Sequence, residues 1–213
     1  MKMKKGLKNV SFVILLFNMC ICLGQDVAIQ KRIIIDVGHG GKDSGAVAKN
    51  GLQEKDIVLE VAKEILRINS KLNQPNLIFL TRYKDSLISL SDRSRLAKSL
   101  NADLFLSLHC NHAENSNARG VEVYVGKNLT KNTRETIWLA YQLQDQFKKH
   151  KGFDSRGVKF ANFQVLRDMN AFCPALLLEL GFLSNKMEAE IFSNHKNLEV
   201  IAKKLLQIIT TIL

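Results

Sequence analysis

The sequence contains 213 residues, and its 31 lysines and arginines against 20 aspartates and glutamates give a formal net charge of +11 at pH 7. The length suits one domain with a sizeable core, and no internal repeat, low-complexity tract or flexible linker divides it. A basic chain is compatible with nucleic acid binding, but a basic run occurs only at residues 148–151. We therefore expect no nucleic acid partner.

The N-terminus has the pattern of a secretory signal peptide. Basic residues precede an apolar run at residues 10–23, and two small residues, Cys22 and Gly24, stand at positions −3 and −1 before Gln25. A retained N-terminal anchor is the alternative, but the apolar run is short for a membrane span and Asn18 interrupts it.

We therefore expect residues 1–24 to be removed and residues 25–213 to form a single exported domain without stable membrane insertion. The periplasm is the expected location, with full export as the alternative. Loss of four lysines lowers the net charge to +7, which favours an anionic extracellular polymer as partner. The remaining cysteines, Cys110 and Cys173, form no disulfide framework, although an oxidising compartment permits one bridge between them.

Strand and helix patterns alternate along the rest of the chain. Short aliphatic or β-branched runs predict strands at residues 32–38, 76–82, 102–110, 120–126 and 174–182. Apolar residues at helical spacing predict helices at residues 54–72, 90–99, 132–150 and most of 188–213. The strand at 120–126 alternates valines with polar residues, so we expect it to be half exposed and near an edge. This alternation indicates an α/β sandwich around a largely parallel sheet.

Four polar residues stand at informative places in this pattern. His39 follows the first strand, His109 ends the strand at 102–110, Glu179 lies near the end of the last strand, and Glu54 opens the first helix. The carboxyl ends of parallel strands gather along one edge of a sheet, where open α/β sheets bind their ligands. We therefore expect these two histidines and two glutamates to converge on one cleft.

Two histidines and one glutamate match the ligand set of a catalytic zinc site, which keeps a further position open for water. The remaining carboxylate then serves as a general base and acid. For His39 the alternative is a turn residue, and for Glu54 an ordinary acid at a helix N-terminus. Glu179 resists such an explanation, because a carboxylate within LLLEL is costly to bury unless it is paired or bound to a metal. Of the other histidines, His112 is expected to be solvated or to support the site, and His150 and His195 to lie on the surface.

Four blocks in order, IIIDVGHGGKDSGA, NGLQEKD, ADLFLSLHCNHA and PALLLELGFLSN, resemble the signature blocks of the zinc-dependent N-acetylmuramoyl-L-alanine amidases. The resemblance implies one zinc ion held by His39, Glu54 and His109, with Glu179 as the catalytic acid and base. It also implies a three-layer α/β/α fold with a mostly parallel or mixed sheet of about six strands. The implied substrate is peptidoglycan or a muropeptide, cut between the lactyl group of N-acetylmuramic acid and L-alanine.

Three further residues fall inside matching blocks and are expected to line the substrate groove: Asn111, Arg167 and Gly181. Some members of the family carry a long inhibitory helix after the second histidine. Here only about ten residues precede the next predicted strand, so we expect no self-inhibitory helix.

Two other functions compete with the amidase. A zinc carboxypeptidase requires a fixed cation for the terminal carboxylate of its substrate, and Arg82, Arg93 and Arg167 are candidates. A non-catalytic module that binds the cell wall is the second alternative, although the chain keeps all four site residues. The sequence leaves the oligomeric state open.

Overall fold

The computed structural model describes residues 30–149 and 154–212. The predicted signal peptide at residues 1–24 lies outside the described residues, as does His150. Within the described ranges, no helix is long and apolar enough to cross a membrane.

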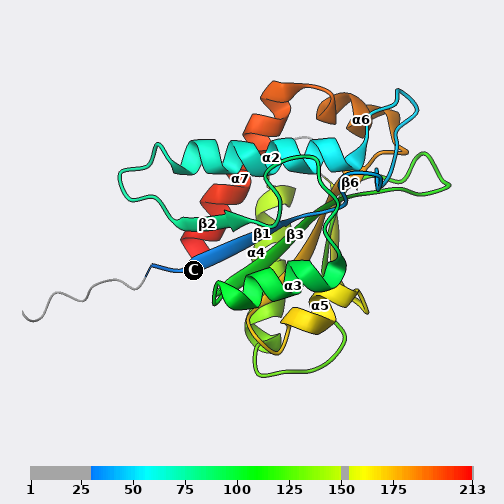
Figure 1. Ribbon diagram of the computed structural model, residues 1–213. Coiled ribbons are helices and arrows are strands. Elements are labelled where there is room, and N and C mark those ends of the chain that lie inside the picture. Colours follow the sequence, from blue (N-terminus) through cyan, green and yellow to red (C-terminus); the bar gives the residue numbers. More distant parts are fainter. Residues whose placement is uncertain (1–29, 150–153, 213) are drawn as a thin grey trace, which may run out of the picture. The chain divides into compact units, whose positions relative to one another are not determined.

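Strands and helices alternate along most of the described chain, except that the fourth strand directly follows the third and the last helix directly follows the one before it (Figure 1). The strands are β1 (Arg32–Val37), β2 (Leu77–Leu80), β3 (Leu104–Asn111), β4 (Val121–Gly126), β5 (Ser155–Ala161) and β6 (Ala175–Phe182). The helices are α2 (Glu54–Asn69), α3 (Leu90–Ser99), α4 (Thr133–Lys148), α5 (Gln164–Met169), α6 (Lys186–Phe192) and α7 (His195–Ile212).

The six strands form one mixed sheet in the order β2-β1-β3-β6-β4-β5. The first four strands in this order run parallel to one another, whereas β4 is antiparallel to β6 and parallel to β5. The carboxyl ends of β1, β3 and β6 therefore lie side by side, which is the arrangement that gathers ligand-binding groups at one edge.

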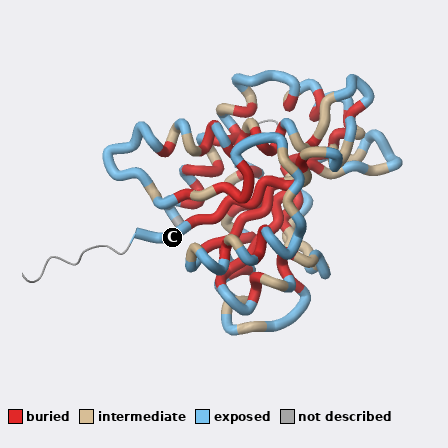
Figure 2. The backbone as a smooth tube through the Cα atoms, viewed as in Figure 1, coloured by how far each residue is buried: buried red, intermediate tan, exposed pale blue. Residues whose placement is uncertain are grey.

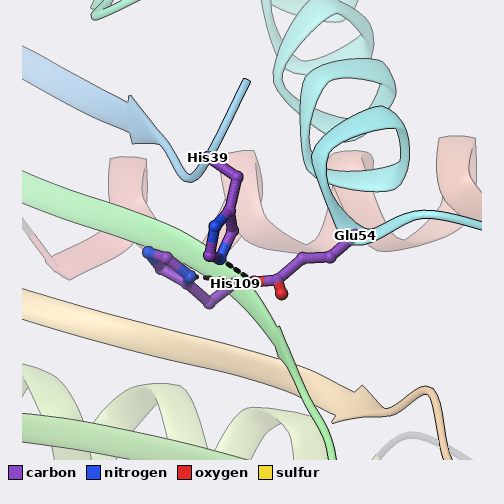
Figure 3. Close-up of side chains that lie close together, drawn as sticks. All are labelled: His39, Glu54 and His109. Carbon is purple, nitrogen blue, oxygen red and sulfur yellow. Dashed lines mark hydrogen bonds and ion pairs between the residues drawn. The ribbon is translucent and has the colours of Figure 1, made fainter. Parts of the chain in front are cut away.

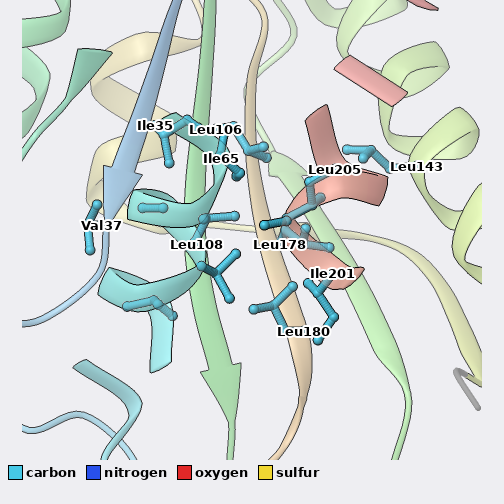
Figure 4. Close-up of a cluster of buried hydrophobic side chains, with 14 of the residues drawn as sticks. Ile35, Val37, Ile65, Leu106, Leu108, Leu143, Leu178, Leu180, Ile201 and Leu205 are labelled. Atoms are coloured by element: carbon cyan, nitrogen blue, oxygen red, sulfur yellow. The ribbon is translucent and has the colours of Figure 1, made fainter. Parts of the chain in front are cut away.

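Helices cover both faces of the sheet, as expected for three layers. One face of the sheet, which we call the α2 face, packs against α2, α4 and α7. Its side chains form the larger apolar core. Figure 4 shows part of this core, where Leu106, Leu178 and Leu180 of the strands meet Ile65 of α2 and Ile201 of α7. The buried backbone in Figure 2 follows the strands of the sheet.

The opposite face of the sheet, which we call the α3 face, is covered by α3 and α5 and has a smaller apolar core. Its strand residues Ile34, Phe105, Ala175 and Leu177 all belong to the first half of their strands. On this face, the carboxyl-terminal halves of β1, β3 and β6 carry polar side chains instead. The candidate site lies there.

Two elements were absent from the sequence prediction, and one prediction was wrong. The strand β5 has the sequence SRGVKFA, which lacks a continuous apolar run because it is an edge strand with half-exposed side chains. The short helix α5 was also missed. The strand at residues 120–126 lies next to the edge strand, as expected, but the prediction that it is half exposed is wrong: α4 packs on β4, β5 pairs with it, and even Glu122 is only 2% exposed.

The two described cysteines do not form the bridge that the sequence permits. Cys110 is buried in the α2 face core and Cys173 in the α3 face core, and both are free. As expected from the alternation of side chains along a strand, Cys110 therefore lies on the other side of the sheet from His109.

Candidate metal and catalytic site

Polar side chains occupy the part of the α3 face that is formed by the carboxyl-terminal halves of β1, β3 and β6. Successive residues of a strand point to opposite faces, so Asp36, His109, Glu179 and Glu122 share the face of the smaller apolar core. Across the sheet, His109 is the register partner of Glu179, and Glu179 is the partner of Glu122. Three neighbouring strands thus present a row of ionisable groups, which is the convergence expected from the strand ends.

Asp36 of β1 anchors this half of the face, and only 1% of its surface is exposed. Its Oδ1 accepts hydrogen bonds from Arg93 Nη1 and Thr81 Oγ1, both at 2.9 Å. Its Oδ2 accepts a hydrogen bond from Ser107 Oγ at 2.6 Å. The buried charge is therefore paired and hydrogen-bonded, and it ties β1 to β3, to α3 and to the end of β2.

Two buried arginines hold the backbone that follows β1. Arg93 Nη2 donates to the carbonyl oxygen of His39 at 2.7 Å, and Arg82 Nη2 donates to that of Gly38 at 2.7 Å. Each arginine is 2% exposed. These bonds fix a turn in which His39 has a φ of 56°, a left-handed conformation that is uncommon for residues other than glycine.

The structure brings His39, Glu54 and His109 together (Figure 3). Glu54 Oε1 lies 3.0 Å from His39 Nε2 and 2.8 Å from His109 Nδ1. The same oxygen accepts a hydrogen bond from the backbone of Cys110 at 2.9 Å, and Oε2 accepts one from Ala46 at 2.7 Å. One carboxylate at the start of α2 is thus shared by two imidazoles, one from the loop after β1 and one from β3, and the three possible ligand atoms lie within 4.8 Å of one another.

The donor set fits a metal ion. Two imidazoles and one carboxylate are the ligands of one class of catalytic zinc site, in which bonds of about 2.0–2.2 Å place the ligand atoms a little over 3 Å apart. Burial alone would raise the pKa of Glu54, but hydrogen bonds with His109 and His39 outweigh it and lower that pKa to about 2. Glu54 is therefore ionised at neutral pH, the form in which a carboxylate can bind a metal ion.

Asp43 orients the first histidine. Its Oδ2 lies 2.9 Å from His39 Nδ1, on the side of the ring away from Glu54. Burial lowers the pKa of His39, but the bonds to Glu54 and Asp43 outweigh this effect and raise its pKa above the ordinary value. A carboxylate on the far nitrogen of a histidine is the usual partner of a metal-ligating imidazole, because it sets the tautomer.

Two glycines allow the cluster to close. A Cβ atom on Gly38 would lie 2.6 Å from the His109 ring, and one on Gly45 would lie 2.4 Å from Glu54 Oε2. Both separations are too short for any side chain. The glycine-rich segment DVGHGGKDSGA therefore serves close packing around the cluster as well as its turn.

Glu179 lies on the strand next to that of His109. Its Oε2 is the single buried side-chain nitrogen or oxygen atom among the described residues that has no hydrogen-bond partner. Burial, followed by the repulsion from Glu54 and Glu122, raises its pKa to about 7, against the opposing effect of His109. Leaving a buried carboxyl oxygen unpaired costs free energy. Such a group is typical of a functional site rather than of a structural one.

A cavity of about 750 Å³ contains His39, His109 and Glu179 in its lining. Its other walls are largely apolar and come from residues 87–90 and from Phe163 to Val165. The lining also includes Asp36, Gly38, Asp43, Arg93 and Leu177. The two candidate histidine ligands and the unpaired carboxyl group thus open into one space of the size that binds small molecules.

The predicted groove residues lie in different surroundings. Asn111 donates from Nδ2 to Glu122 at 3.0 Å, beside the row of ionisable groups. Arg167 is exposed and donates to the backbone of Asn162, whereas Gly181 packs against Glu188 and Phe192. None of the three lines the 750 Å³ cavity.

Elsewhere, His112 and His195 are exposed, as expected. His195 lies with Glu60 and Glu64 in a second group of metal-type ligands on α2 and α7. There Arg67 forms an ion pair with Glu64 at 2.6 Å, so this carboxylate is already paired with a cationic side chain of the protein.

Sequence reasoning missed three residues that build the site, Asp36, Asp43 and Glu122, and it considered Arg82 and Arg93 only as cations for a carboxypeptidase substrate. Asp43 stands four residues after His39 in a loop, and this spacing was a usable signal for a supporting carboxylate. The roles of the arginines had no local signal, because their partners lie more than 25 residues away along the chain or are backbone carbonyl groups.

These features define a class of protein: a three-layer α/β/α protein with a His–Glu–His cluster and a buried carboxyl group at the strand ends of a mixed sheet. The family described as Amidase_3, N-acetylmuramoyl-L-alanine amidase, matches residues 33–211. The chain belongs to this family.

Individual relatives agree with this assignment. The chain is 38% identical over 162 residues to N-acetylmuramoyl-L-alanine amidase LytC of Bacillus subtilis, an alignment that covers 76% of this chain and 31% of LytC. It is 35% identical over 175 residues to the endolysin of Bacillus phage SPP1, which covers 82% of this chain and 63% of the endolysin. The chain thus spans less than two thirds of the length of these relatives.

A solved structure shares the fold. The crystal structure of N-acetylmuramoyl-L-alanine amidase from Clostridium difficile 630 superposes with a TM-score of 0.78 and 32% sequence identity. The superposition covers 85% of this chain and 96% of that one.

The buried ion pair between Asp36 and Arg93 yields a first prediction. Arg93→Met leaves the Asp36 carboxylate buried without its counter-ion, so the free energy of unfolding in urea should fall by about 3–5 kcal/mol. Arg95→Met on the same helix is the control, because Arg95 is 75% exposed and pairs with Asp92 at the surface; it should cost less than about 1 kcal/mol. Equal losses for the two variants would contradict the role given to Asp36.

A second prediction concerns the pH dependence of the metal-free protein. The carboxyl of Glu179 has an ordinary pKa of 4.5 in the unfolded chain and about 7 in the folded one. Between these values the folded state binds more protons, so stability falls as the pH rises. Relative to Glu179→Gln, the chelated wild type should lose up to about 3 kcal/mol between pH 4.5 and pH 8, measured by urea unfolding. Glu114→Gln, on an exposed loop, is the control; a constant difference between wild type and Glu179→Gln would refute the burial argument.

Proposed function

We propose that this chain is a zinc-dependent N-acetylmuramoyl-L-alanine amidase. It hydrolyses the amide between the lactyl group of N-acetylmuramic acid and the L-alanine of the stem peptide in peptidoglycan. The single observation that carries the proposal is the unpaired, buried carboxyl of Glu179, which shares a cavity with His39 and His109 in a chain of the amidase family.

In this proposal His39, Glu54 and His109 hold one zinc ion per chain. Asp43 keeps the proton on His39 Nδ1, so Nε2 offers its lone pair to the metal. Bound zinc supplies two things in such a site: a lower pKa for its water and polarisation of the substrate carbonyl group. The arginine contacts to the loop after β1 position His39 before the metal binds.

Glu179 moves the proton. It takes a proton from the attacking water and returns it to the nitrogen of the leaving amine, because an amide nitrogen leaves poorly unless it is protonated. A pKa of about 7 suits both transfers near neutral pH. The apolar walls of the cavity around Glu179 support this role, because they maintain the burial that raises its pKa.

The carboxypeptidase alternative is weaker on these contacts. Such an enzyme needs a free cation for the substrate's terminal carboxylate. Arg82 and Arg93 are buried and donate to backbone carbonyl groups, and Arg93 is also paired with Asp36. Arg167 is exposed but lies outside the cavity lining.

We also propose that residues 1–24 direct export and that the domain at residues 25–213 acts on the cell wall outside the cytoplasm, in the periplasm or beyond it. The basic and then apolar N-terminal pattern supports this part of the proposal. Residues 112–120, between β3 and β4, contain bends and turns, and we propose that the domain needs no activator to displace an inhibitory helix.

Digestion of purified peptidoglycan tests the proposal. The zinc-loaded chain should release intact stem peptides with a free L-alanine amine, identified by mass spectrometry. Chelation should abolish release and added zinc should restore it. Glu179→Gln should bind zinc normally but lower the rate by about 10²–10⁴-fold, because the proton carrier is lost.

Glu190→Gln, an exposed glutamate on α6, is the matched control and should retain full activity. Release of single amino acids would favour the carboxypeptidase. Metal binding without any product would favour the non-catalytic wall-binding module.

A further inference from the structure

Glu122 is the most heavily bonded carboxylate on the α3 face. Its Oε1 accepts hydrogen bonds from Arg156 Nε at 2.6 Å and from Lys159 Nζ at 2.5 Å. Its Oε2 accepts from Tyr124 Oη at 2.7 Å and from Asn111 Nδ2 at 3.0 Å. One buried charge therefore has two cationic partners, although a single cation would neutralise it.

A β-bulge brings both cations to the same face. Residues three apart on a regular strand point to opposite faces, and this spacing separates Arg156 from Lys159. Between them, Gly157 adopts a φ of 84°, and the register with β4 slips by one residue over this stretch. The extra residue reverses the alternation once, so both side chains reach Glu122. Bulges of this kind often re-aim side chains beside active sites.

The pair leaves positive charge available to a ligand. The side chains of Arg156 and Lys159 are each 39% exposed, whereas that of Glu122 is 2% exposed. Two cations against one carboxylate leave a local charge of +1 at the surface. Arg156 also lies over the ring of Phe182, with 5.0 Å between its Cζ and the ring centroid, so its position is fixed by packing as well as by charge.

This cationic pair is continuous with the cavity. Lys159 Nζ lies 5.9 Å from the centroid of the Tyr124 ring, and that ring meets Phe163 edge to face at 5.3 Å. Phe163 lines the cavity that contains Glu179. Glu179 on β6 is separated from β5 by β4, so two strand spacings of about 4.8 Å place the pair roughly 10 Å from the acid and base.

We propose that Arg156 and Lys159 form a subsite for a carboxylate on the peptide side of the substrate. The inference rests on the proposed function. The peptide released by the reaction is anionic, whereas the sugar side is neutral once its lactyl group is in the amide. An extended peptide covers about 3.3–3.6 Å per residue, so the free α-carboxylate of D-glutamate, the second residue of the stem, falls within reach of the pair. The apolar walls at residues 87–90 are left for the sugar side.

The test uses two synthetic muramoyl tripeptides that differ only in whether the α-carboxyl of D-glutamate is free or amidated. The wild-type chain loaded with zinc should have the higher kcat/KM for the free acid. Lys159→Met should lower kcat/KM for the acid by about tenfold, the value of one charged hydrogen bond, and leave the amide unchanged. Lys159→Arg should restore the preference. Lys63→Met, which removes an exposed cation from α2, is the control for net charge.

Binding separates this inference from the proposed function. Both ligands are titrated by calorimetry into zinc-loaded Glu179→Gln, with and without Lys159→Met. Cleavage without any preference for the acid, or equal losses on both ligands, would overturn the subsite and leave the amidase intact. Preferential binding of the acid without cleavage by the wild type would overturn the amidase and leave the subsite.

Discussion

The buried ion pair between Asp36 and Arg93 is the interaction on which the rest of the site depends. Asp36 lies where the apolar half of the α3 face ends, and a charge there is tolerated only because Arg93, Thr81 and Ser107 satisfy it. The same arginine holds the carbonyl group of His39. Stability of the sheet and position of the first histidine are therefore coupled through one guanidinium group.

The carboxyl groups around the candidate site are of two kinds, those with hydrogen-bond partners and one without. Asp36, Glu54 and Glu122 have partners on several elements, whereas Glu179 Oε2 has none among the described residues. The hydrogen bonds of these paired carboxylates hold the strand ends and the start of α2 in place. Glu179, beside them, stays free to exchange a proton. Among the described residues, the one buried side-chain oxygen that lacks a hydrogen bond therefore belongs to Glu179, beside the candidate metal ligands.

The sequence predicted the ordered elements that carry strong apolar patterns, and the convergence of His39, Glu54, His109 and Glu179 followed from their places at strand and helix ends. It did not predict β5, because an edge strand with a glycine bulge lacks an apolar run. For the same reason the pairing of Arg156 and Lys159 with Glu122 was not foreseeable. These contacts depend on the strand order and the register, which one sequence does not contain.

The measurement that tests the central claim most directly is the zinc-edge X-ray absorption spectrum of the chain reconstituted with one equivalent of zinc. The proposed site predicts a first shell of two imidazole nitrogens and carboxylate or water oxygens at about 2.0–2.2 Å, and loss of one imidazole in His109→Ala. A shell that is unchanged in His109→Ala, or that contains sulfur, would contradict the assignment of the metal to His39, Glu54 and His109.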